Sequence, residues 1–221
     1  MKQITIASDE VVSIIGQRGT GKTTVATAIH HTLVASCPYP EIGLILSTKE
    51  DPNDLAMWRK AGYVEVKPNR LRSDSDNRLL VVRCLAQKGL TKWEVAQRVI
   101  QWCYDRCNVE ILIDEFKQVC PTARTPGEAL DQAFGQGRGR NIGIIGCTQE
   151  PVNIPRQLIS QAQHALLMRC PFVNDEKMLQ EMCRQYKGDL PDAHGFWWGD
   201  LVGGAAWTYY PDFSKFPLVI R

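Results

Sequence analysis

The chain has 221 residues, with 26 lysines and arginines against 24 aspartates and glutamates, and a formal net charge of +2. Hydrophobic residues make up 44% and charged residues 23%, as in ordinary globular proteins. This composition excludes a disordered or collagen-like chain, and no apolar run reaches the roughly 18 residues that a membrane-spanning helix needs. The first ten residues carry no recognisable secretory signal, so we expect an intracellular protein that folds as a single domain over residues 1–221.

Short apolar runs alternate with segments suited to helices. The predicted strands are 11–15, 43–47, 63–66, 79–82, 109–113, 142–147 and 164–168. The predicted helices are 23–35, 55–62, a helix capped by Thr91 that runs to about Asp105, 127–135, a short helix opened by Pro155, and 175–186. Residues 135–140 are expected to be flexible, and residues 196–210 to form a terminal hairpin. Such alternation predicts an α/β fold with a mostly parallel sheet and helices on both faces.

Eight cysteines occur, and none forms the C-x-x-C pair of zinc or redox sites. Cys103 and Cys107 lie four residues apart on a predicted helix and could supply two metal ligands. Small apolar side chains in a reducing compartment are the simpler interpretation. We therefore predict neither disulfides nor structural zinc.

A phosphate-binding motif lies between the first predicted strand and the first predicted helix. Residues 16–23 read G-x-x-x-x-G-K-T, the pattern of a P-loop in its required context. Glycines allow a tight turn whose N–H groups face phosphate oxygens at a helix N-terminus. We expect Lys22 to reach the β- and γ-phosphates and the Thr23 hydroxyl to bind Mg²⁺. The predicted ATP-binding residues are Gly16, Gln17, Arg18, Gly19, Thr20, Gly21, Lys22, Thr23 and Thr24.

Two acidic residues follow the apolar strand 109–113. Because ligands bind beyond the carboxyl ends of parallel strands, Asp114 is placed to hold the Mg²⁺ shell. Glu115 is placed to orient or deprotonate a water that attacks the γ-phosphate. The alternative is that Glu115 only stabilises a helix N-terminus. A water-activating carboxylate beside the metal indicates an ATPase, since a small-molecule kinase gains nothing from it.

A third polar strand end is provided by Gln149, after strand 142–147. This strand is expected beside the P-loop strand, where Gln149 can bind the γ-phosphate or the attacking water. Arg138 and Arg140 precede the strand, at the opposite edge of the sheet from the P-loop. They suit a trans arginine finger that reaches a neighbouring subunit, or solvated or DNA-binding arginines. Arg124 and Arg156 are the other finger candidates.

These motifs, in this order, resemble the FtsK–HerA superfamily of DNA-pumping ATPases. The likeness rests on GQRGTGKT, on ILIDEF, and on the run that begins GRGRNIGIIGCTQEP and continues to residue 169. It covers roughly residues 9–170 and is strongest for the genome-packaging ATPases of tailless icosahedral dsDNA viruses with an internal membrane. Residues 171–221 agree only in general character, as a C-terminal helix and hairpin.

The resemblance implies a RecA-like core that binds ATP and Mg²⁺ and forms a homo-oligomeric ring, with six subunits favoured over five. It further implies translocation of double-stranded DNA into a procapsid, contacts with capsid or vertex proteins, and a location in the host cytoplasm and at a virion vertex. Lys22, Thr23, Asp114, Glu115 and Gln149 take over the family's site roles. Three alternatives remain: a DNA-transfer ATPase of conjugation type, a P-loop phosphotransferase acting on a small substrate, and a nucleotide-switched structural protein.

Charge and aromatic residues add two weaker signals. Residues 56–106 hold 11 lysines and arginines against 5 acidic residues, as non-specific DNA contact would require, although a solvated basic face is the alternative. Arg70, Arg72 and Arg78 lie in its irregular part and are candidates for a pore-facing loop. The aromatic pairs at 197–198 and 209–210 are expected in the core or in a subunit or capsid contact.

Overall fold

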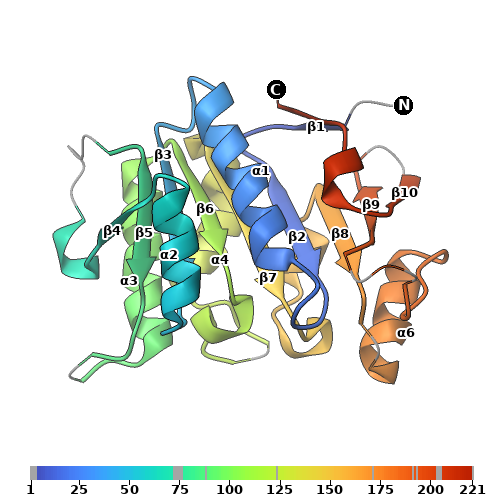
Figure 1. Ribbon diagram of the computed structural model, residues 1–221. Coiled ribbons are helices and arrows are strands. Elements are labelled where there is room, and N and C mark those ends of the chain that lie inside the picture. Colours follow the sequence, from blue (N-terminus) through green and yellow to red (C-terminus); the bar gives the residue numbers. More distant parts are fainter. Residues whose placement is uncertain are drawn as a thin grey trace.

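The computed structural model describes residues 4–71, 77–87, 89–122, 124–170, 172–190, 192, 194–202 and 206–220. Figure 1 shows the strands of the main sheet forming one twisted layer with helices before and behind it. The strands are β1 (Ile4–Ile6), β2 (Val11–Ile15), β3 (Ile42–Ser47), β4 (Val64–Val66), β5 (Leu79–Arg83), β6 (Val109–Ile113), β7 (Ile142–Thr148), β8 (His164–Met168), β9 (Phe196–Asp200), β10 (Ala206–Tyr210) and β11 (Leu218–Ile220).

The helices alternate with the strands as the sequence predicts. They are α1 (Lys22–Ser36), α2 (Pro52–Lys60), α3 (Lys92–Arg106), α4 (Glu128–Gln136), α5 (Gln157–Ser160) and α6 (Val173–Met182). Short 3₁₀ turns occur at η1 (Pro68–Arg70), η2 (Phe116–Val119), η3 (Gly137–Arg140), η4 (Pro151–Asn153) and η5 (Phe213–Lys215). Thr91 caps α3 as expected, because its hydroxyl accepts from the Glu94 N–H while the Glu94 carboxylate accepts from the Thr91 N–H.

The main sheet has nine strands in the order β10-β9-β8-β2-β7-β6-β3-β5-β4. Strands β8 to β4 in this order are parallel, and β9 and β10 add an antiparallel hairpin at one edge. The P-loop strand β2 therefore lies between β7 and β8, and β7 separates it from β6. This order brings the ends of β2, β7 and β6 to one edge of the sheet, the lower edge in Figure 1.

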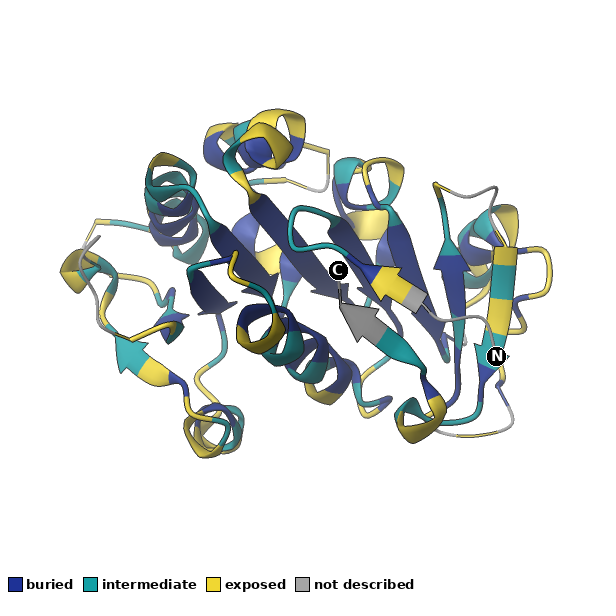
Figure 2. Ribbon diagram, turned by 90° about the horizontal axis from the view of Figure 1, so that it is seen from above, coloured by how far each residue is buried: buried dark blue, intermediate teal, exposed yellow. Residues whose placement is uncertain are grey.

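Alternating residues of each buried strand face opposite helical layers. In β6, Ile111 and Ile113 pack with α3 and α4, whereas Leu112 packs with α1 and α2. Figure 2, seen from above, shows the buried sheet with helices on both sides. Burial on both faces explains why the strands are continuous apolar runs, which is what made them recognisable in the sequence. The predicted α/β fold is therefore confirmed.

The C-terminal hairpin extends the main sheet and does not stand apart from it. The buried Trp198 ring packs against His164 of β8 and Phe216, and Trp197 packs against the cluster around α6, so both faces of β9 are covered. A separate parallel pair of β1 and β11 joins the two ends of the chain beside α1. These two short strands are not among the strands predicted from the sequence.

One sequence expectation is wrong. The glycine-rich run from Gly135 to Arg140 is not a flexible segment, because Gly135 and Gln136 end α4 and the four residues of η3 follow them. Within the described residues, no disulfide joins the cysteines, and no helix has the length and apolar character needed to cross a bilayer.

Candidate functional site

The P-loop connects the buried end of β2 to the N-terminus of α1. Gly19 and Gly21 adopt φ values of +84° and +91°, which non-glycine residues rarely adopt, so the motif's spacing follows from backbone geometry. The Gly16 N–H donates to the Thr148 carbonyl (3.1 Å) and the Gln17 N–H to the Arg169 carbonyl (2.8 Å). The loop is thus fixed to the ends of β7 and β8, and its turn is held before any ligand binds.

Lys22 begins α1 and points back into the loop. Its Nζ donates a 2.7 Å hydrogen bond to the Gln17 carbonyl, and the residue is 8% exposed. Burial lowers the pKa of the Lys22 ammonium, although nearby acidic groups oppose the shift. Phosphate oxygens placed in the loop would stabilise its charged form. Thr24, the next predicted residue after Thr23, is exposed.

Thr23 and Asp114 meet at the carboxyl end of the sheet. The Thr23 hydroxyl donates to Asp114 Oδ1 at 2.7 Å, and the Asp114 residue is 2% exposed. A hydroxyl and a carboxylate are the oxygen ligands that Mg²⁺ prefers, so this pair fits the ion. The sheet order explains the contact, since β2 and β6 end at the same edge.

Glu115 and Gln149 form the second pair at this edge. Gln149 Nε2 donates to Glu115 Oε2 at 2.8 Å, which joins the end of β6 to the end of β7. Burial raises the pKa of the Glu115 carboxyl, and the hydrogen bond from Gln149 partly opposes the rise. A carboxylate with a raised pKa beside a phosphate site is placed to accept a proton from water.

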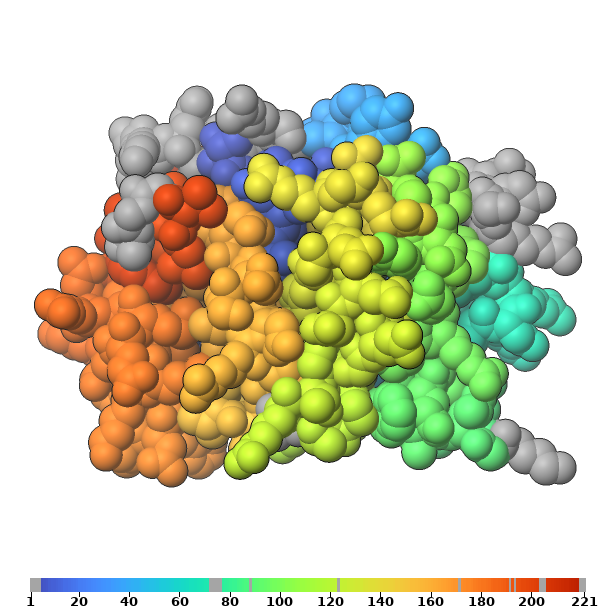
Figure 3. All heavy atoms as spheres, turned by 180° about the vertical axis from the view of Figure 1, so that it is seen from behind, coloured from blue at the N-terminus to red at the C-terminus, as the bar shows by residue number. Residues whose placement is uncertain are grey.

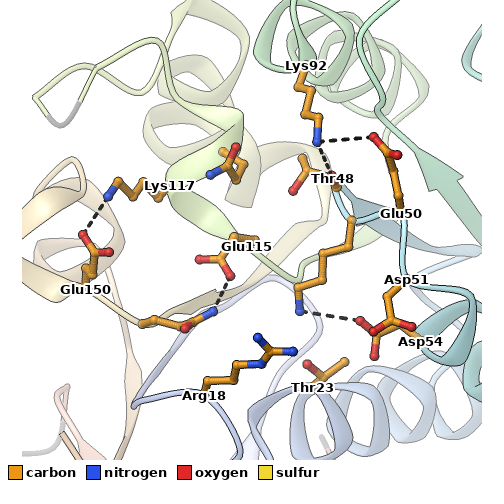
Figure 4. Close-up of a pocket in the computed structure, with 13 residues that line it drawn as sticks. Arg18, Thr23, Thr48, Glu50, Asp51, Asp54, Lys92, Glu115, Lys117 and Glu150 are labelled. Carbon is orange, nitrogen blue, oxygen red and sulfur yellow. Dashed lines mark hydrogen bonds and ion pairs between the residues drawn. The ribbon is translucent and has the colours of Figure 1, made fainter.

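A cavity of about 670 Å³ opens in front of these pairs. Figure 4 shows Thr23, Glu115 and Arg18 converging on it, with Lys117 paired to Glu150 along one wall. Its lining residues are Arg18, Thr23, Thr48, Lys49, Glu50, Asp51, Asp54, Lys92, Glu115, Lys117, Gln118, Gln149 and Glu150. The cavity therefore contains charges of both signs around the P-loop.

Lys49, which follows β3, is a site residue that was not predicted from the sequence. Its Nζ lies 2.6 Å from Asp114 Oδ2 and 3.7 Å from Asp54 Oδ2. Burial alone would lower the pKa of Lys49, but attraction to Asp114 outweighs it and raises the pKa. The available signal was that β3 is a third strand with a polar end at this edge. His194 was missed too, and its Nδ1 lies 3.3 Å from the Thr20 carbonyl of the P-loop.

The structure places Arg138 and Arg140 at the start of β7, away from the nucleotide-side cavity. Arg138 is 78% exposed in its side chain and lies 3.3 Å from Asp9. The Arg140 guanidinium stacks over the Tyr104 ring at 4.5 Å, and its Nε donates to the Tyr104 carbonyl at 2.9 Å. These two arginines therefore do not join the cis site.

Arg124 and Arg156 are both exposed and line a second cavity of about 1170 Å³. This cavity lies between the loop after η2, the η4–α5 segment and α6. Figure 3, seen from behind, shows the amber η4–α5 segment between the green to yellow-green α3–α4 layer and the orange α6 region. Neither arginine lines the cavity in front of the P-loop.

The basic segment 56–106 is only partly available for DNA. Arg78 donates to the carbonyls of Val34 and Pro40, each at 2.9 Å, so it secures the loop after α1. Arg70 is exposed on η1, and Arg72 lies outside the described residues. Arg78 is thus a structural residue, whereas Arg70 remains a candidate for DNA contact.

The order of the strands and the P-loop at their carboxyl edge define a RecA-like P-loop NTPase fold, and the solved structures agree. The genome packaging NTPase B204 from Sulfolobus turreted icosahedral virus 2, in complex with AMPPCP, has a TM-score of 0.68 at 14% identity, covering 94% of this chain and 100% of that chain. B204, the DNA-packaging ATPase from Sulfolobus turreted icosahedral virus, has a TM-score of 0.64 at 20% identity, with 93% and 98% covered.

A more distant likeness is to the pCW3 conjugation coupling protein TcpA, with a TM-score of 0.59 at 13% identity, covering 94% of this chain and 62% of that chain. No protein-family model and no curated protein sequence matches the chain. At these identities the likeness establishes the fold, and the function has to be argued from the site.

Proposed function

We propose that this protein is an ATPase that drives double-stranded DNA into a viral procapsid. The observation that carries the proposal is the meeting of the Thr23–Asp114 and Glu115–Gln149 pairs beside the P-loop, around one cavity. A metal-holding pair and a water-activating pair are what ATP hydrolysis needs. The fold shared with packaging NTPases supports the same function.

The P-loop binds the phosphates in this mechanism. Its N–H groups and the N-terminus of α1 would bind the phosphate oxygens. Lys22 exchanges its bond to the Gln17 carbonyl for the β- and γ-phosphates, which bear more negative charge than a carbonyl. Arg18 lines the cavity and adds a second positive charge near the phosphates.

Thr23 and Asp114 are the residues that would hold Mg²⁺. When bound, the ion neutralises charge on the β- and γ-phosphate oxygens. Thr23 would offer its hydroxyl oxygen to the ion, and Asp114 would offer a carboxylate that the end of β6 holds in place.

Glu115 accepts the proton of the attacking water. Burial raises its pKa, so its carboxylate is a stronger base than that of an exposed glutamate. Gln149 donates to Glu115 before nucleotide binds, so it holds the carboxylate at the edge of the cavity. When the γ-phosphate enters, the same amide can turn to it, and its release from Glu115 frees an oxygen for the water.

Translocation of DNA requires contacts with its phosphate backbone and the action of more than one subunit. We propose a homo-oligomeric ring of six subunits, with five as the alternative, that follows the phosphate backbone without reading bases. Arg138 is the preferred trans arginine, because Arg140 is held by Tyr104. The ring would act in the host cytoplasm and dock on capsid or vertex proteins at a virion vertex.

A conjugation-type DNA translocase would share this chemistry, and the likeness to TcpA favours it as the second candidate. The two differ in partner, since a packaging motor engages a capsid. A small-molecule phosphotransferase has no supporting feature among the described residues.

The test is steady-state ATP hydrolysis with and without non-specific double-stranded DNA across a salt series. A phosphate-tracking motor is stimulated by DNA, and the stimulation declines as salt rises. Turnover that ignores DNA, in rings as well as in monomers, would contradict the motor. The Glu115→Gln variant checks that the measured hydrolysis belongs to this site.

A further inference from the structure

The ion pair between Lys49 and Asp114 lies where the metal should act. Asp114 is almost fully buried, and each of its oxygens has a partner. Oδ1 accepts from the Thr23 hydroxyl at 2.7 Å, and Oδ2 lies 2.6 Å from the Lys49 ammonium. Without a metal, the lysine therefore supplies the positive charge that this buried carboxylate requires.

We propose that Lys49 is a place-holding cation, which neutralises Asp114 until Mg²⁺ and nucleotide bind and then transfers to Asp54. The inference rests on the proposed function, because it assumes that Thr23 and Asp114 hold the metal. It goes further by assigning a role to a residue outside the P-loop and the acidic strand end.

Competition between the two cations follows from their distances. A metal ion held by Thr23 and Asp114 would come within a few ångströms of the Lys49 ammonium, and like charges repel strongly at a partly desolvated site. A metal ion held at Asp114 would also compete for Oδ2, the carboxylate oxygen that Lys49 contacts. Lys49 must therefore leave Oδ2 when the metal binds.

Asp54 is the carboxylate on the cavity side to which the Lys49 ammonium can move. Its Oδ2 is 3.7 Å from the Lys49 Nζ, and both residues line the cavity. Figure 4 shows the contact at Asp54, in the first turn of α2. Lys49 lies in the short connection between β3 and α2, so a change of side-chain rotamer transfers the ion pair without moving the sheet.

The transfer would link metal binding to α2. With Lys49 on Asp114, the carboxylate at the N-terminus of α2 shares its cation with the metal site. With Lys49 on Asp54 alone, α2 gains a complete ion pair while the metal holds Asp114. Nucleotide state is thereby transmitted to a helix that lies over the sheet beside α1.

The test measures Mn²⁺ binding by electron paramagnetic resonance at saturating AMPPCP, with no turnover involved. Mn²⁺ replaces Mg²⁺ because both prefer oxygen ligands in an octahedral arrangement. Lys49→Met should bind Mn²⁺ about ten-fold more tightly than the wild type, since the competing charged hydrogen bond is gone. The matched control is Lys92→Met, which removes a cavity charge that contacts Glu50 and the Thr48 carbonyl but not Asp114. Equal effects of both variants would overturn the proposal.

Asp54→Asn tests the transfer from the other side and leaves both metal-holding side chains, Thr23 and Asp114, in the protein. It should weaken Mn²⁺ binding several-fold because Lys49 loses its acceptor, and the effect should vanish in the Lys49→Met background. Asp51→Asn is its control, since asparagine keeps the cap of α2 while removing one charge from the same cavity. An Asp54→Asn effect that persists without Lys49 would overturn the transfer. Failure of the wild type to bind Mn²⁺ with AMPPCP would instead contradict the proposed function, and this proposal with it.

Discussion

Gln149 donates a 2.8 Å hydrogen bond to the carboxylate of Glu115, joining two residues from neighbouring strands. The contact exists because β7 lies directly between β2 and β6, so its polar end is adjacent to both the P-loop and the acidic strand end. Two consequences can be measured, one for the rate of hydrolysis and one for its dependence on pH.

Glu115→Gln should abolish hydrolysis while leaving nucleotide binding intact. Loss of a general base typically lowers a rate by about 10²–10⁴-fold, whereas the phosphate contacts of the P-loop do not involve this residue. Single-turnover hydrolysis and equilibrium binding of a fluorescent ATP analogue separate the two effects. The control is Glu150→Gln, because Glu150 lines the same cavity but pairs with Lys117. A fully active Glu115→Gln would show that another group activates water.

The pH profile of kcat/KM should have an acid limb above the ordinary glutamate range of about 4.3, because burial raises the pKa of Glu115. The base must be deprotonated, so activity rises with pH through this raised pKa and falls below it. Gln149→Ala should move the limb to higher pH, since the lost hydrogen bond favoured the charged form. Gln118→Ala, in the same cavity, should leave the limb in place. A limb that moves downward in Gln149→Ala would exclude Glu115 as the titrating group.

Thr23→Val should weaken binding of Mg²⁺ with nucleotide by ten-fold or more, because it replaces a metal-ligating hydroxyl with a methyl group of similar shape. Thr24→Val is the matched control, since this exposed neighbour has no contact with Asp114. Calorimetric titration of ADP with and without Mg²⁺ measures the difference. The two variants should be alike when Mg²⁺ is omitted, and a loss confined to the metal-free titration would argue against Thr23 as a ligand.

Much of the fold was predictable from the sequence because the central strands are buried on both faces. β6 and β8 have the predicted bounds, since an apolar run that ends in polar residues marks both limits of such a strand. The short strands β1 and β11 gave no signal, as three residues pair with three others from the opposite end of the chain.

The site was predictable where a motif fixes the chemistry, as at Lys22, Thr23, Asp114 and Glu115. The role of Lys49 was not predictable, because a lysine after a strand indicates no function by itself. Only the sheet order, which places β3 beside β6, shows that Lys49 lies next to Asp114. Arg140 was mistaken for a mobile residue because glycines surround it, whereas its partner Tyr104 lies on α3, remote in sequence. Contacts that depend on strand order, rather than on spacing, are what the sequence alone does not contain.

Two glycines should respond oppositely to alanine substitution. A Cβ on Gly146 in β7 would collide with the buried Leu158 side chain, and overpacking of this kind typically costs about 1–3 kcal/mol. A Cβ on Gly135 in α4 meets open space, so Gly135→Ala should stabilise the protein by about 0.5–1 kcal/mol through helix propensity. Urea denaturation gives both free energies. Destabilisation by Gly135→Ala would contradict its place in a helix.

Alanine substitutions of Arg138 and Arg140 should distinguish a catalytic role in a neighbouring subunit from a role in stability. Arg140→Ala removes a cation–π contact and a hydrogen bond to the Tyr104 carbonyl, so it should lower the free energy of unfolding by about 1–2 kcal/mol. Arg138→Ala should change stability little, because its side chain is 78% exposed and its pair with Asp9 is a surface contact.

If Arg138 reaches the ATP of a neighbouring subunit, Arg138→Ala rings should bind nucleotide normally and lose turnover by about 10³-fold or more. When this variant is titrated into wild-type protein, DNA-stimulated hydrolysis should fall in proportion to the fraction of wild-type active sites that have a variant subunit as neighbour. Isolated variant subunits should bind nucleotide as the wild type does. Because the variant leaves folding intact, a loss of turnover cannot be attributed to instability, as it could for Arg140→Ala. Full turnover in Arg138→Ala rings would transfer the role to Arg124 or Arg156, which line the second cavity.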